Sequence, residues 1–399
     1  MQKILLFFLI IRVGLLTAQD YNILDYHAIA DGTTMNTSAI QAAIDAAYNH
    51  GGGRVIIPSG NFLSGTIILK SNVELHLMEN AVLLGSTNPD DYQKLNRWTA
   101  FVMADNAQHI AITGKGKIDG QGRALALHID SLFYAGELDS NYYELNNKRP
   151  KVTVRPQLIE FVECTNVVVK NITLLNSASW LQTYERCNNV FIDSITVRTD
   201  AYWNNDGLDI DNCRNVRITN CDINSADDGI CLKSQLPDLY CDSIYIANCR
   251  VRSSASAVKF GTVSHGGFKN VVIENIQVYD TYRSAIAIEC VDGGTLENVF
   301  VNNIKATNTG NAIFIRLGER TKRGDGGTLR NILIQNMEVE IAFERPDYAY
   351  DIRGPELPFF YNPIPASITG IPGNNVEHVT LENITIHYPG RGNKGMVYL

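Results

Sequence analysis

Three closely spaced aspartates are the side chains of this sequence best suited to catalysis. Asp206 stands in the segment Asn-Asn-Asp-Gly-Leu-Asp, and Asp227 and Asp228 stand in Ala-Asp-Asp-Gly. The 21 residues from Asp206 to Asp227 match one unit of a repeat that runs through the chain, so we expect the three carboxyl groups to meet on neighbouring coils. Carboxylates brought together repel, and at least one should keep its proton to a higher pH. A cluster of aspartates with different pKa values can therefore supply both the general acid and the general base of a reaction.

The short repeat supports this stacking. Each unit has a polar residue, alternating apolar and polar positions and a second polar residue, as in Asn270-Val-Val-Ile-Glu-Asn-Ile. Brief alternation bounded by Asn, Gly, Asp or Ser predicts short strands joined by turns, and such units bury their apolar faces only by stacking. We therefore predict an all-β parallel β-helix with coils about 4.8 Å apart. The units begin at Asn166, Asn189, Asn215, Ser243, Asn270, Asn298, Asn331 and His378.

Length and composition favour a single exported domain over residues 20–399. The 399 residues are 45% hydrophobic, and no linker or low-complexity segment interrupts them after residue 20. Residues 1–19 have the basic start, short apolar core and small-residue end of a secretory signal peptide, with cleavage expected near Ala18 or Gln19. We expect export to the periplasm or the exterior, without a membrane span. The net charge of -8 argues against a nucleic-acid partner.

Eight cysteines lie in the middle of the chain, and four of them occupy one repeat position. A buried stack of thiols at one turn and disulfides among some of them are both open. We expect no metal site, because no Cys-x-x-Cys or paired histidine spacing occurs, and no cofactor. The eight are Cys164, Cys187, Cys213, Cys221, Cys231, Cys241, Cys249 and Cys290.

An amphipathic helix is expected from Asn36 to about Tyr48, ended by Gly51-Gly52-Gly53. Asn36 is a favourable helix-capping residue. A helix over the first coil would protect the exposed end of the apolar ladder, so we assign it a capping role.

Alternation also predicts which side chains face outward near the aspartates. With Leu208 and Ile210 inward, Asp209 and Asp211 point outward, and either is open to being a plain solvated residue. These outward-facing positions are here called the outward stripe. Its basic residues Lys233, Lys259 and Arg316 are candidates to bind an acidic sugar. For Lys259, pairing with Glu289 is an equally open alternative. The stripe continues through Cys231, Lys233, Lys259, Ala287, Glu289, Phe314 and Arg316.

An ordered set of motifs resembles the polygalacturonase-like glycoside hydrolases of family 28. It comprises Arg155-Pro-Gln-Leu-Ile-Glu-Phe, Asn176-Ser-Ala-Ser-Trp, Asn204-Asn-Asp-Gly-Leu-Asp and Asp227-Asp-Gly-Ile-Cys-Leu-Lys-Ser. Ala30-Asp-Gly and Leu69-Lys-Ser-Asn extend the match, which covers nearly the whole chain after the signal region. The resemblance implies a right-handed β-helix and inverting hydrolysis of a glycosidic bond in a pectin-type polysaccharide.

The resemblance also implies roles for individual residues. Asp227 would protonate the leaving oxygen, while Asp206 and Asp228 would hold and deprotonate water; inverting enzymes separate such carboxyl groups by roughly 6.5 to 9.5 Å. Asn204 would orient a carboxylate, and Gly207 would let the backbone turn.

Two departures from the family pattern bear on the substrate. The family's Gly-His-Gly corresponds to Ala255-Ser256-Ala257, and its Arg-x-Lys, which grips a galacturonate carboxylate, corresponds to Ala287-Ile288-Glu289. Because Glu289 would repel that carboxylate, we expect a poor polygalacturonase and a neutral sugar beside the cleaved bond, as in rhamnogalacturonan.

Further candidates and alternatives remain open. His265 is either a displaced replacement for the missing histidine or a turn residue, and Trp203 is favoured over Trp180 as a platform for a sugar ring. The long irregular stretches 124–156 and 343–375 would decide between internal and terminal cleavage. Three other functions are a polygalacturonase or exo-galacturonidase, an inactive carbohydrate-binding solenoid, and a lyase. The lyase would use calcium held by Asp206, Asp209, Asp227 and Asp228, with Lys233 or Lys259 as the base.

Overall fold

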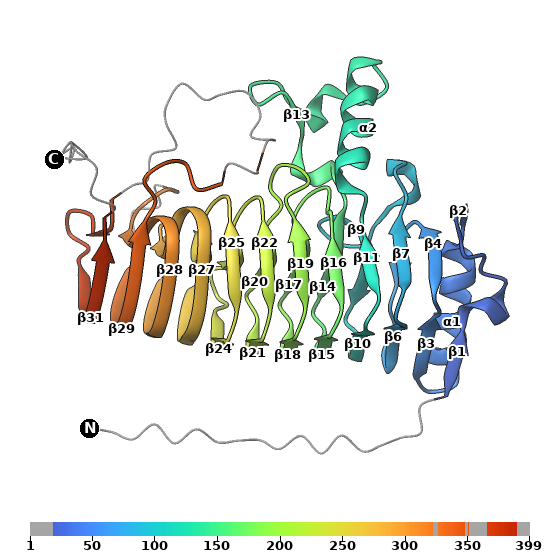
Figure 1. The fold of residues 1–399 in the computed structure, drawn as a ribbon, viewed down its shortest axis with the longest axis horizontal. Helices are drawn as coiled ribbons and strands as arrows, with labels where there is room; N and C mark the ends of the chain where they lie inside the picture. The colour runs from blue at the N-terminus through green and yellow to red at the C-terminus, as the bar shows by residue number, and fades with distance from the viewer. Residues whose placement is uncertain (1–18, 322–325, 348–349, 351–364, 389–399) are drawn as a thin grey trace.

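The computed structural model describes residues 19–321, 326–347, 350 and 365–388. Over this range the chain winds into one long solenoid, with α1 (Thr37–Asn49) at its amino-terminal end (Figure 1). Nearly all strand pairs are parallel and join one coil to the next, so the predicted right-handed parallel β-helix is confirmed. The expected signal peptide lies outside the described residues, apart from Gln19.

Each coil contributes one strand to each of three rows. The row that carries the aspartates holds β5 (Ile67–Ile68), β9 (Thr99–Asp105), β14 (Gln157–Val162), β17 (Gln182–Glu185), β20 (Leu208–Asp211), β23 (Ile230–Ser234) and β26 (Val258–Ser264). The second row holds β1 (Asp20–Asn22), β3 (Gly53–Ile57), β6 (Val73–Leu77), β10 (Gln108–Gly114), β15 (Thr165–Lys170), β18 (Asn188–Asp193), β21 (Arg214–Thr219) and β24 (Cys241–Ala247). The third row holds β2 (Asp31–Met35), β4 (Gly60–Ser64), β7 (Ala81–Gly85), β11 (Lys117–Asp119), β16 (Thr173–Leu175), β19 (Thr196–Thr199), β22 (Asp222–Ser225) and β25 (Arg250–Ser253).

Toward the carboxyl-terminal end the strands lengthen and run through the corners between rows. These strands are β27 (Gly267–Cys290), β28 (Thr295–Leu317), β29 (Thr328–Ile341) and β31 (Val376–His387), with the short β30 (Ser367–Thr369) paired to the end of β28. They keep the one-coil register, so side chains continue to stack in columns.

The repeat signature follows from backbone geometry. Asn166, Asn189, Asn215 and their counterparts adopt the left-handed conformation, with φ of 58°, 57° and 54°. Asparagine tolerates that conformation better than most residues with a side chain. The side chains also bond from coil to coil, since Asn189 Nδ2 donates to Asn166 Oδ1 at 3.0 Å. The asparagines therefore both turn the chain and tie successive coils together.

Apolar residues on the inner face of each strand fill the solenoid. In one column Val190, Val216, Ile244 and Val271 are register partners, and each is at most 2% exposed. All eight cysteines are buried and none is disulfide-bonded, which agrees with the thiol-stack interpretation. Seven of them belong to this core, while Cys231 lies in the outward stripe. Stability thus comes from contacts between neighbouring coils.

Helix α1 covers the first coils, as predicted. It buries Ile40, Ala43, Ile44 and Ala47 and lies against β1, β3 and β5. The expected capping bond from Asn36 is absent, because its amide is used elsewhere: Oδ1 accepts from Ile29 N at 2.6 Å and Nδ2 donates to Thr34 O at 2.7 Å. Asn36 therefore anchors the preceding loop.

The stretch 124–156 is folded, contrary to the expected irregular loop. It contains most of α2 (Gly122–Tyr134), the antiparallel pair β12 (Tyr143–Glu144) and β13 (Arg149–Pro150), and two short 3-10 turns (Ser140–Tyr142 and Val152–Val154). The Phe133 and Tyr143 rings stack with centroids 3.7 Å apart, which holds the pair against α2. This unit stands out from the solenoid above the strands (Figure 1). The second stretch, 343–375, lies largely outside the described residues.

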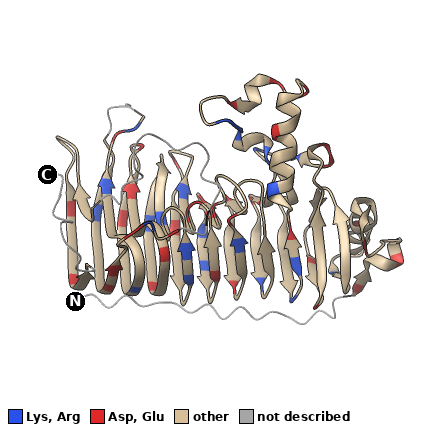
Figure 2. Cartoon of the chain, turned by 45° about the horizontal axis from the view of Figure 1, so that its top comes forward, with Lys and Arg blue, Asp and Glu red and all other residues tan. Residues whose placement is uncertain are grey.

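The surface of the solenoid is mixed in charge. Acidic and basic residues are interspersed along the coils (Figure 2). No helix among the described residues is long and apolar enough to cross a membrane.

Candidate active site

The three aspartates come together at the start of two neighbouring strands. Asp206 lies two residues before β20 and Asp228 two residues before β23, and these strands pair in register. Two backbone bonds lock the turns together: Gly207 N donates to Asp228 O at 2.8 Å, and Asp227 N donates to Asn205 O at 3.2 Å. Asp206 and Asp228 are each 3% exposed. The structure therefore brings the carboxyl groups together on adjacent coils, as expected.

Gly207 is required for a reason other than the one expected. It does not adopt a positive φ. A Cβ at this position would lie 2.6 Å from Gly229 O and 2.7 Å from Ile223 Cγ2. Gly207 therefore permits close approach of two coils beneath the aspartates.

Two buried lysines pair with the aspartates. Lys233 Nζ donates to Asp206 Oδ2 at 3.0 Å and also bonds Asp209 Oδ1, while Lys259 Nζ donates to Asp228 Oδ2 at 2.8 Å. The interpretation of Asp209 as a solvated residue was wrong, since it is fully buried and ion-paired. The pairing of Lys259 with Glu289 was also wrong, because the ammonium group contacts Asp228.

The two lysines shift the pKa values of the neighbouring aspartates to different extents. Burial alone would raise the pKa of Asp228, but the charges of Lys259 and Lys233 outweigh it and hold that pKa below its ordinary value. Burial and the neighbouring charge of Asp228 raise the pKa of Asp227. Asp206 and Asp209 share one ammonium group, and burial raises the pKa of both. The pKa of Asp228 is thus held below its ordinary value, while the pKa of the neighbouring Asp227 is raised above it.

Three serines hold the turn that carries the paired aspartates. Ser256, at the position of the family histidine, donates its backbone N–H to Asp228 Oδ1 at 3.3 Å. Ser253 Oγ and Ser225 Oγ donate to Asp227 O at 2.6 and 2.8 Å. Three serine positions therefore fix the Asp227–Asp228 turn.

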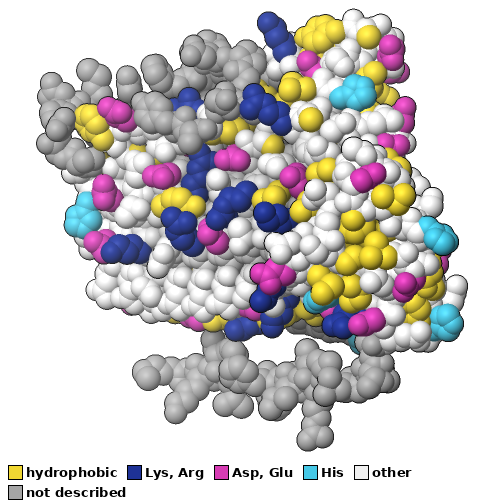
Figure 3. Space-filling view, turned by 45° about the vertical axis from the view of Figure 1, so that its right-hand side comes forward, with side chains coloured by type: hydrophobic (Ala, Val, Ile, Leu, Met, Phe, Trp, Pro, Cys, Tyr) yellow, Lys and Arg dark blue, Asp and Glu magenta, His cyan; other side chains and the backbone are white. Residues whose placement is uncertain are grey.

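The outward stripe follows the predicted register. Asp209, Cys231, Lys259, Ala287 and Phe314 are successive partners, and Glu289 pairs with Arg316 one column along. Glu289 is 8% exposed; burial raises its pKa, and Lys259 and Arg316 oppose that shift. The middle of this face shows lysine and arginine side chains close to acidic ones (Figure 3).

Arg283 is a nearby cation that was not predicted from the sequence. Its backbone N–H donates to Ala255 O at 2.8 Å, which places it one coil beyond the serine turn. Its charge acts on both Asp227 and Asp228 and lowers their pKa values. The 28-residue interval between Ala255 and Arg283 equals a coil of the repeat, and that spacing was the available signal.

Three predicted residues lie away from the carboxyl groups. Asn204 Oδ1 accepts from Arg155 Nη2 at 2.8 Å, and within the described chain Asn204 makes no bond to a carboxylate, so the orienting role is not supported. Trp203 lies 4.5 Å from the Arg149 guanidinium, beside β13. His265 follows β26, at the end of that strand opposite Ser256. Instead Trp180 approaches the cluster, with Lys233 Nζ 4.2 Å from its ring centre.

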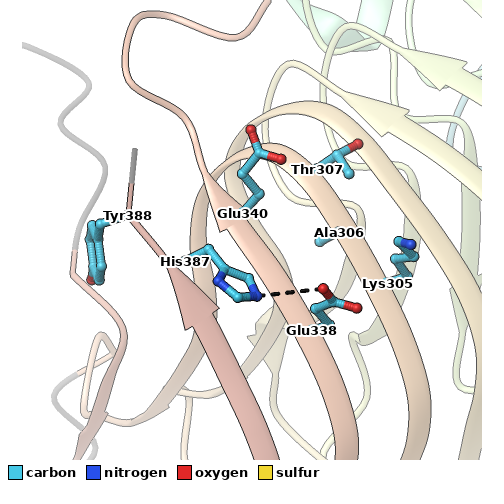
Figure 4. Close-up of a pocket in the computed structure, with 7 residues that line it drawn as sticks. All are labelled: Lys305, Ala306, Thr307, Glu338, Glu340, His387 and Tyr388. Atoms are coloured by element: carbon cyan, nitrogen blue, oxygen red, sulfur yellow. Dashed lines mark ion pairs between the residues drawn. The ribbon is translucent and has the colours of Figure 1, made fainter. Parts of the chain in front are cut away.

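A groove of about 410 Å³ near the carboxyl-terminal end is lined by Lys305, Glu338, Glu340 and His387 (Figure 4). Its side chains come from β28, β29 and β31, and His387 Nε2 lies 3.4 Å from Glu338 Oε1. Because Lys305 stacks in the column of Gln277 and Arg250, this groove belongs to the third row and not to the aspartate row.

Comparisons with known proteins agree with this geometry. The model of the glycosyl hydrolases family 28 matches residues 49–341. A probable polygalacturonase of Vitis vinifera is 27% identical over 321 residues, covering 75% of this chain and 57% of the relative. An exo-poly-alpha-D-galacturonosidase of Dickeya chrysanthemi is 27% identical over 352 residues, covering 76% and 58%.

A solved exopolygalacturonase structure from Thermotoga maritima superposes with a TM-score of 0.71 at 24% identity, covering 92% of each chain, which supports the fold. This chain spans 57 to 58% of the length of the two curated relatives. Since the family model covers most of the chain and its motifs build the aspartate cluster, the chain belongs to the glycosyl hydrolases family 28.

Proposed function

We propose that the chain is an inverting glycoside hydrolase that cleaves a pectin-type polysaccharide. Asp227 donates a proton to the leaving glycosidic oxygen, and Asp228, together with Asp206, holds and deprotonates the attacking water. The observation that carries this proposal is the placement of Lys259, which contacts Asp228 and leaves Asp227 without a lysine contact among the described residues. The pKa of Asp228 is thereby lowered while that of the neighbouring Asp227 is raised, which separates a base from an acid.

The difference between the pKa values of Asp228 and Asp227 suits the two roles that the reaction needs, a base and an acid. A base must be ionised before water attacks, and an acid must hold its proton as the bond breaks. Lys233 contacts both Asp206 and Asp209, and its charge opposes the rise that burial causes in the pKa values of both groups. Asp228 or Asp206 takes a proton from the attacking water and later releases it to solvent, and Asp227 regains from solvent the proton that it gave to the leaving oxygen.

Within pectin, we propose a neutral sugar beside the cleaved bond, as in rhamnogalacturonan. Glu289 occupies the position where the family has a lysine for the galacturonate carboxylate, and it is buried. Lys259, whose charge acts on Glu289, is already paired with Asp228. A uronate carboxylate at this position would therefore meet a like charge and lose its expected partner.

Polygalacturonase or exo-galacturonidase activity is the second candidate. Arg283 and Arg316 place positive charge around Glu289, and their charges oppose the rise of its pKa. The names of the two curated relatives also favour galacturonan. These cations would offset part of the repulsion from Glu289.

The calcium-dependent lyase fits the donor set less well. Oxygens of Asp206 and Asp228 lie within 4.8 Å of each other and of Cys231 Sγ, but calcium prefers six to eight oxygen ligands over a thiol. The proposed lysine bases are also poor ones. Although burial alone would lower the pKa values of Lys233 and Lys259, their aspartate partners raise them above the ordinary value.

Product analysis tests the function. The chain and its Asp227→Asn variant are incubated with rhamnogalacturonan and with polygalacturonan, and new reducing ends are counted. We expect release from rhamnogalacturonan, reduced about 10²- to 10⁴-fold by the substitution because a general acid is lost. Release from polygalacturonan at the same rate would refute the neutral-sugar proposal. Binding without release from either polymer would favour a carbohydrate-binding solenoid, and an unsaturated ultraviolet-absorbing product would favour a lyase.

We further propose that residues 1–19 are a signal peptide, that residues 20–399 form a single domain, and that the chain is exported. The basic and apolar pattern of the first residues and the continuous solenoid support these statements. Amino-terminal sequencing of the protein recovered outside the cytoplasm checks the cleavage near Ala18 or Gln19.

A further inference from the structure

Arg155 is a buried arginine whose side chain spans three neighbouring coils. It lies two residues before β14 and is 0% exposed. Its Nη1 donates to Ala178 O at 2.8 Å and to Trp203 O at 2.6 Å, and its Nη2 donates to Asn204 Oδ1 at 2.8 Å. Ala178 lies in the turn before β17, while Trp203 and Asn204 lie in the turn before β20. One side chain therefore joins the turns that precede three successive strands of the aspartate row.

The charge of Arg155 has no carboxylate partner among the described residues. A fourth hydrogen bond runs from Nε to Pro150 O at 3.1 Å, so all four bonds are accepted by uncharged oxygens. Burial lowers the pKa of Arg155 to about 10. A buried charge without a counter-ion is costly, and an apolar side chain of similar size would avoid that cost. What distinguishes the arginine from such a side chain is its set of N–H donors, which point in several fixed directions.

The turn that receives two of these bonds leads directly to Asp206. Asn204 is held by Arg155, and Asp206 follows it by two residues. Asn205, between them, is 0% exposed and ties the turn to the preceding coil, since its Nδ2 donates to Ser177 O at 2.9 Å. Side-chain hydrogen bonds therefore fix the chain immediately before Asp206.

The position of this turn also affects the other groups of the aspartate cluster. Leu181 N donates to Asp206 O at 2.9 Å, and Gly207 N donates to Asp228 O at 2.8 Å. Asp206 Oδ2 accepts from Lys233 Nζ at 3.0 Å. A shift of the turn would therefore move the Asp206 carboxyl group relative to Asp228 and to Lys233.

We propose that Arg155 is a positioning residue, which fixes the turn before β20 and thereby the carboxyl group of Asp206. This inference rests on the proposed hydrolase function, in which Asp206 helps to hold the attacking water. The planar guanidinium has five N–H groups, and the four hydrogen bonds use four of them. A lysine carries its donors on one nitrogen and cannot reach acceptors on all these turns. A misplacement of about 1 Å at a reacting group can cost about 10²-fold in rate.

Arg155 also fastens the β12–β13 pair through its bond to Pro150 O, which lies in β13. An effect on Asp206 must therefore be distinguished from a loosening of the unit that contains α2. The stack of Phe133 on Tyr143 holds the same unit together and does not involve Arg155. Phe133→Ala loosens that unit and leaves the bonds of Arg155 to the turns in place, so it is the matched control.

Steady-state kinetics of the full chain on rhamnogalacturonan and polygalacturonan test the proposal. We expect Arg155→Lys to lower kcat about 10²-fold with little change in KM, because Arg155 is buried and the substrate contacts are kept. Asn204→Gly removes one of the four bonds and tolerates the φ of 55° at this position, so it should lower kcat several-fold in the same way. Phe133→Ala should leave both constants nearly unchanged.

Amide hydrogen exchange gives a readout that needs no activity. The backbone N–H groups of Leu181, Gly207 and Asp227 bond to or from this turn, so they should exchange faster in Arg155→Lys, while those of β21 on the same coil stay unchanged. An unaltered kcat in a folded Arg155→Lys variant, an equal loss in Phe133→Ala, or faster exchange in all coils alike would overturn the inference. Inactivity of the unaltered chain toward both polymers contradicts the proposed function, and exchange at the three amides then decides whether Arg155 fixes the turn.

Discussion

Replacement of Lys259 by methionine should change the pH dependence of the reaction in a defined direction. Lys259 Nζ lies 2.8 Å from Asp228 Oδ2, and both groups are at most 9% exposed. An opposite charge at this distance lowers the pKa of a carboxyl group by about one to three units. Each unit corresponds to about 1.36 kcal/mol. The methionine variant therefore loses roughly 1.4 to 4 kcal/mol of preference for the ionised form of Asp228.

The sign follows from the role of Asp228 as the ionised base. Its pKa in the folded protein is held below the ordinary value, so the active form persists to low pH. Without Lys259, burial and the remaining acids raise that pKa, and the acidic limb of kcat/KM moves up by about one to three pH units. Lys233 and Arg283 remain and limit the shift.

The assay is the initial rate of reducing-end release, measured from pH 3 to pH 8. Lys259→Arg retains a positive charge and should keep most of the acidic limb in place, while Lys305→Met removes an exposed lysine outside the aspartate row and should not move it. Thermal unfolding checks that each variant is folded, because an uncompensated buried carboxylate also destabilises the protein. An acidic limb unchanged in a folded, active Lys259→Met variant would refute the assigned role.

Four further outcomes are expected. Gly207→Ala should lower the unfolding temperature and the activity together, because its Cβ would lie 2.6 Å from Gly229 O; calorimetry and rates measure both. Ile218→Ala, in the fully buried ladder, should cost about 2–5 kcal/mol in urea unfolding. Trp180→Ala should reduce kcat/KM, whereas Trp203→Ala should change it little, since Trp180 contacts Lys233. A reducing agent should leave the unfolding midpoint unchanged, because the cysteines are unpaired.

Much of the architecture was predictable because the solenoid repeats its physical constraints in every coil. Each turn needs a residue that tolerates positive φ, and each strand needs inward apolar side chains, so the asparagines and the Val, Ile and Leu positions recur. The same regularity predicted the outward stripe, since Asp209, Cys231 and Lys259 are register partners. The stacking of Asp206 with Asp227 and Asp228 followed from a spacing near one coil.

Pairing between side chains was less predictable, because the repeat fixes columns but not the reach of a flexible side chain. Lys259 points back to Asp228, one coil toward the amino terminus, and not forward to Glu289. The segments outside the repeat were also missed, as α2 and the β12–β13 pair have no counterpart in other described coils. Trp98 lies in such a segment, and nothing in its local sequence indicates that its backbone N–H donates a hydrogen bond to Glu160.

The column arrangement of the outward stripe ties each position on this face to a separate stretch of sequence. Each coil supplies one side chain to each column, and coils are about 4.8 Å apart, so neighbouring positions along the face come from segments about one coil apart in the chain. Under the proposed function, a change at position 289 would alter the recognition of one sugar while the coils on either side keep their register. Gain or loss of a whole coil would lengthen or shorten this face by one such step and leave the aspartate cluster unchanged.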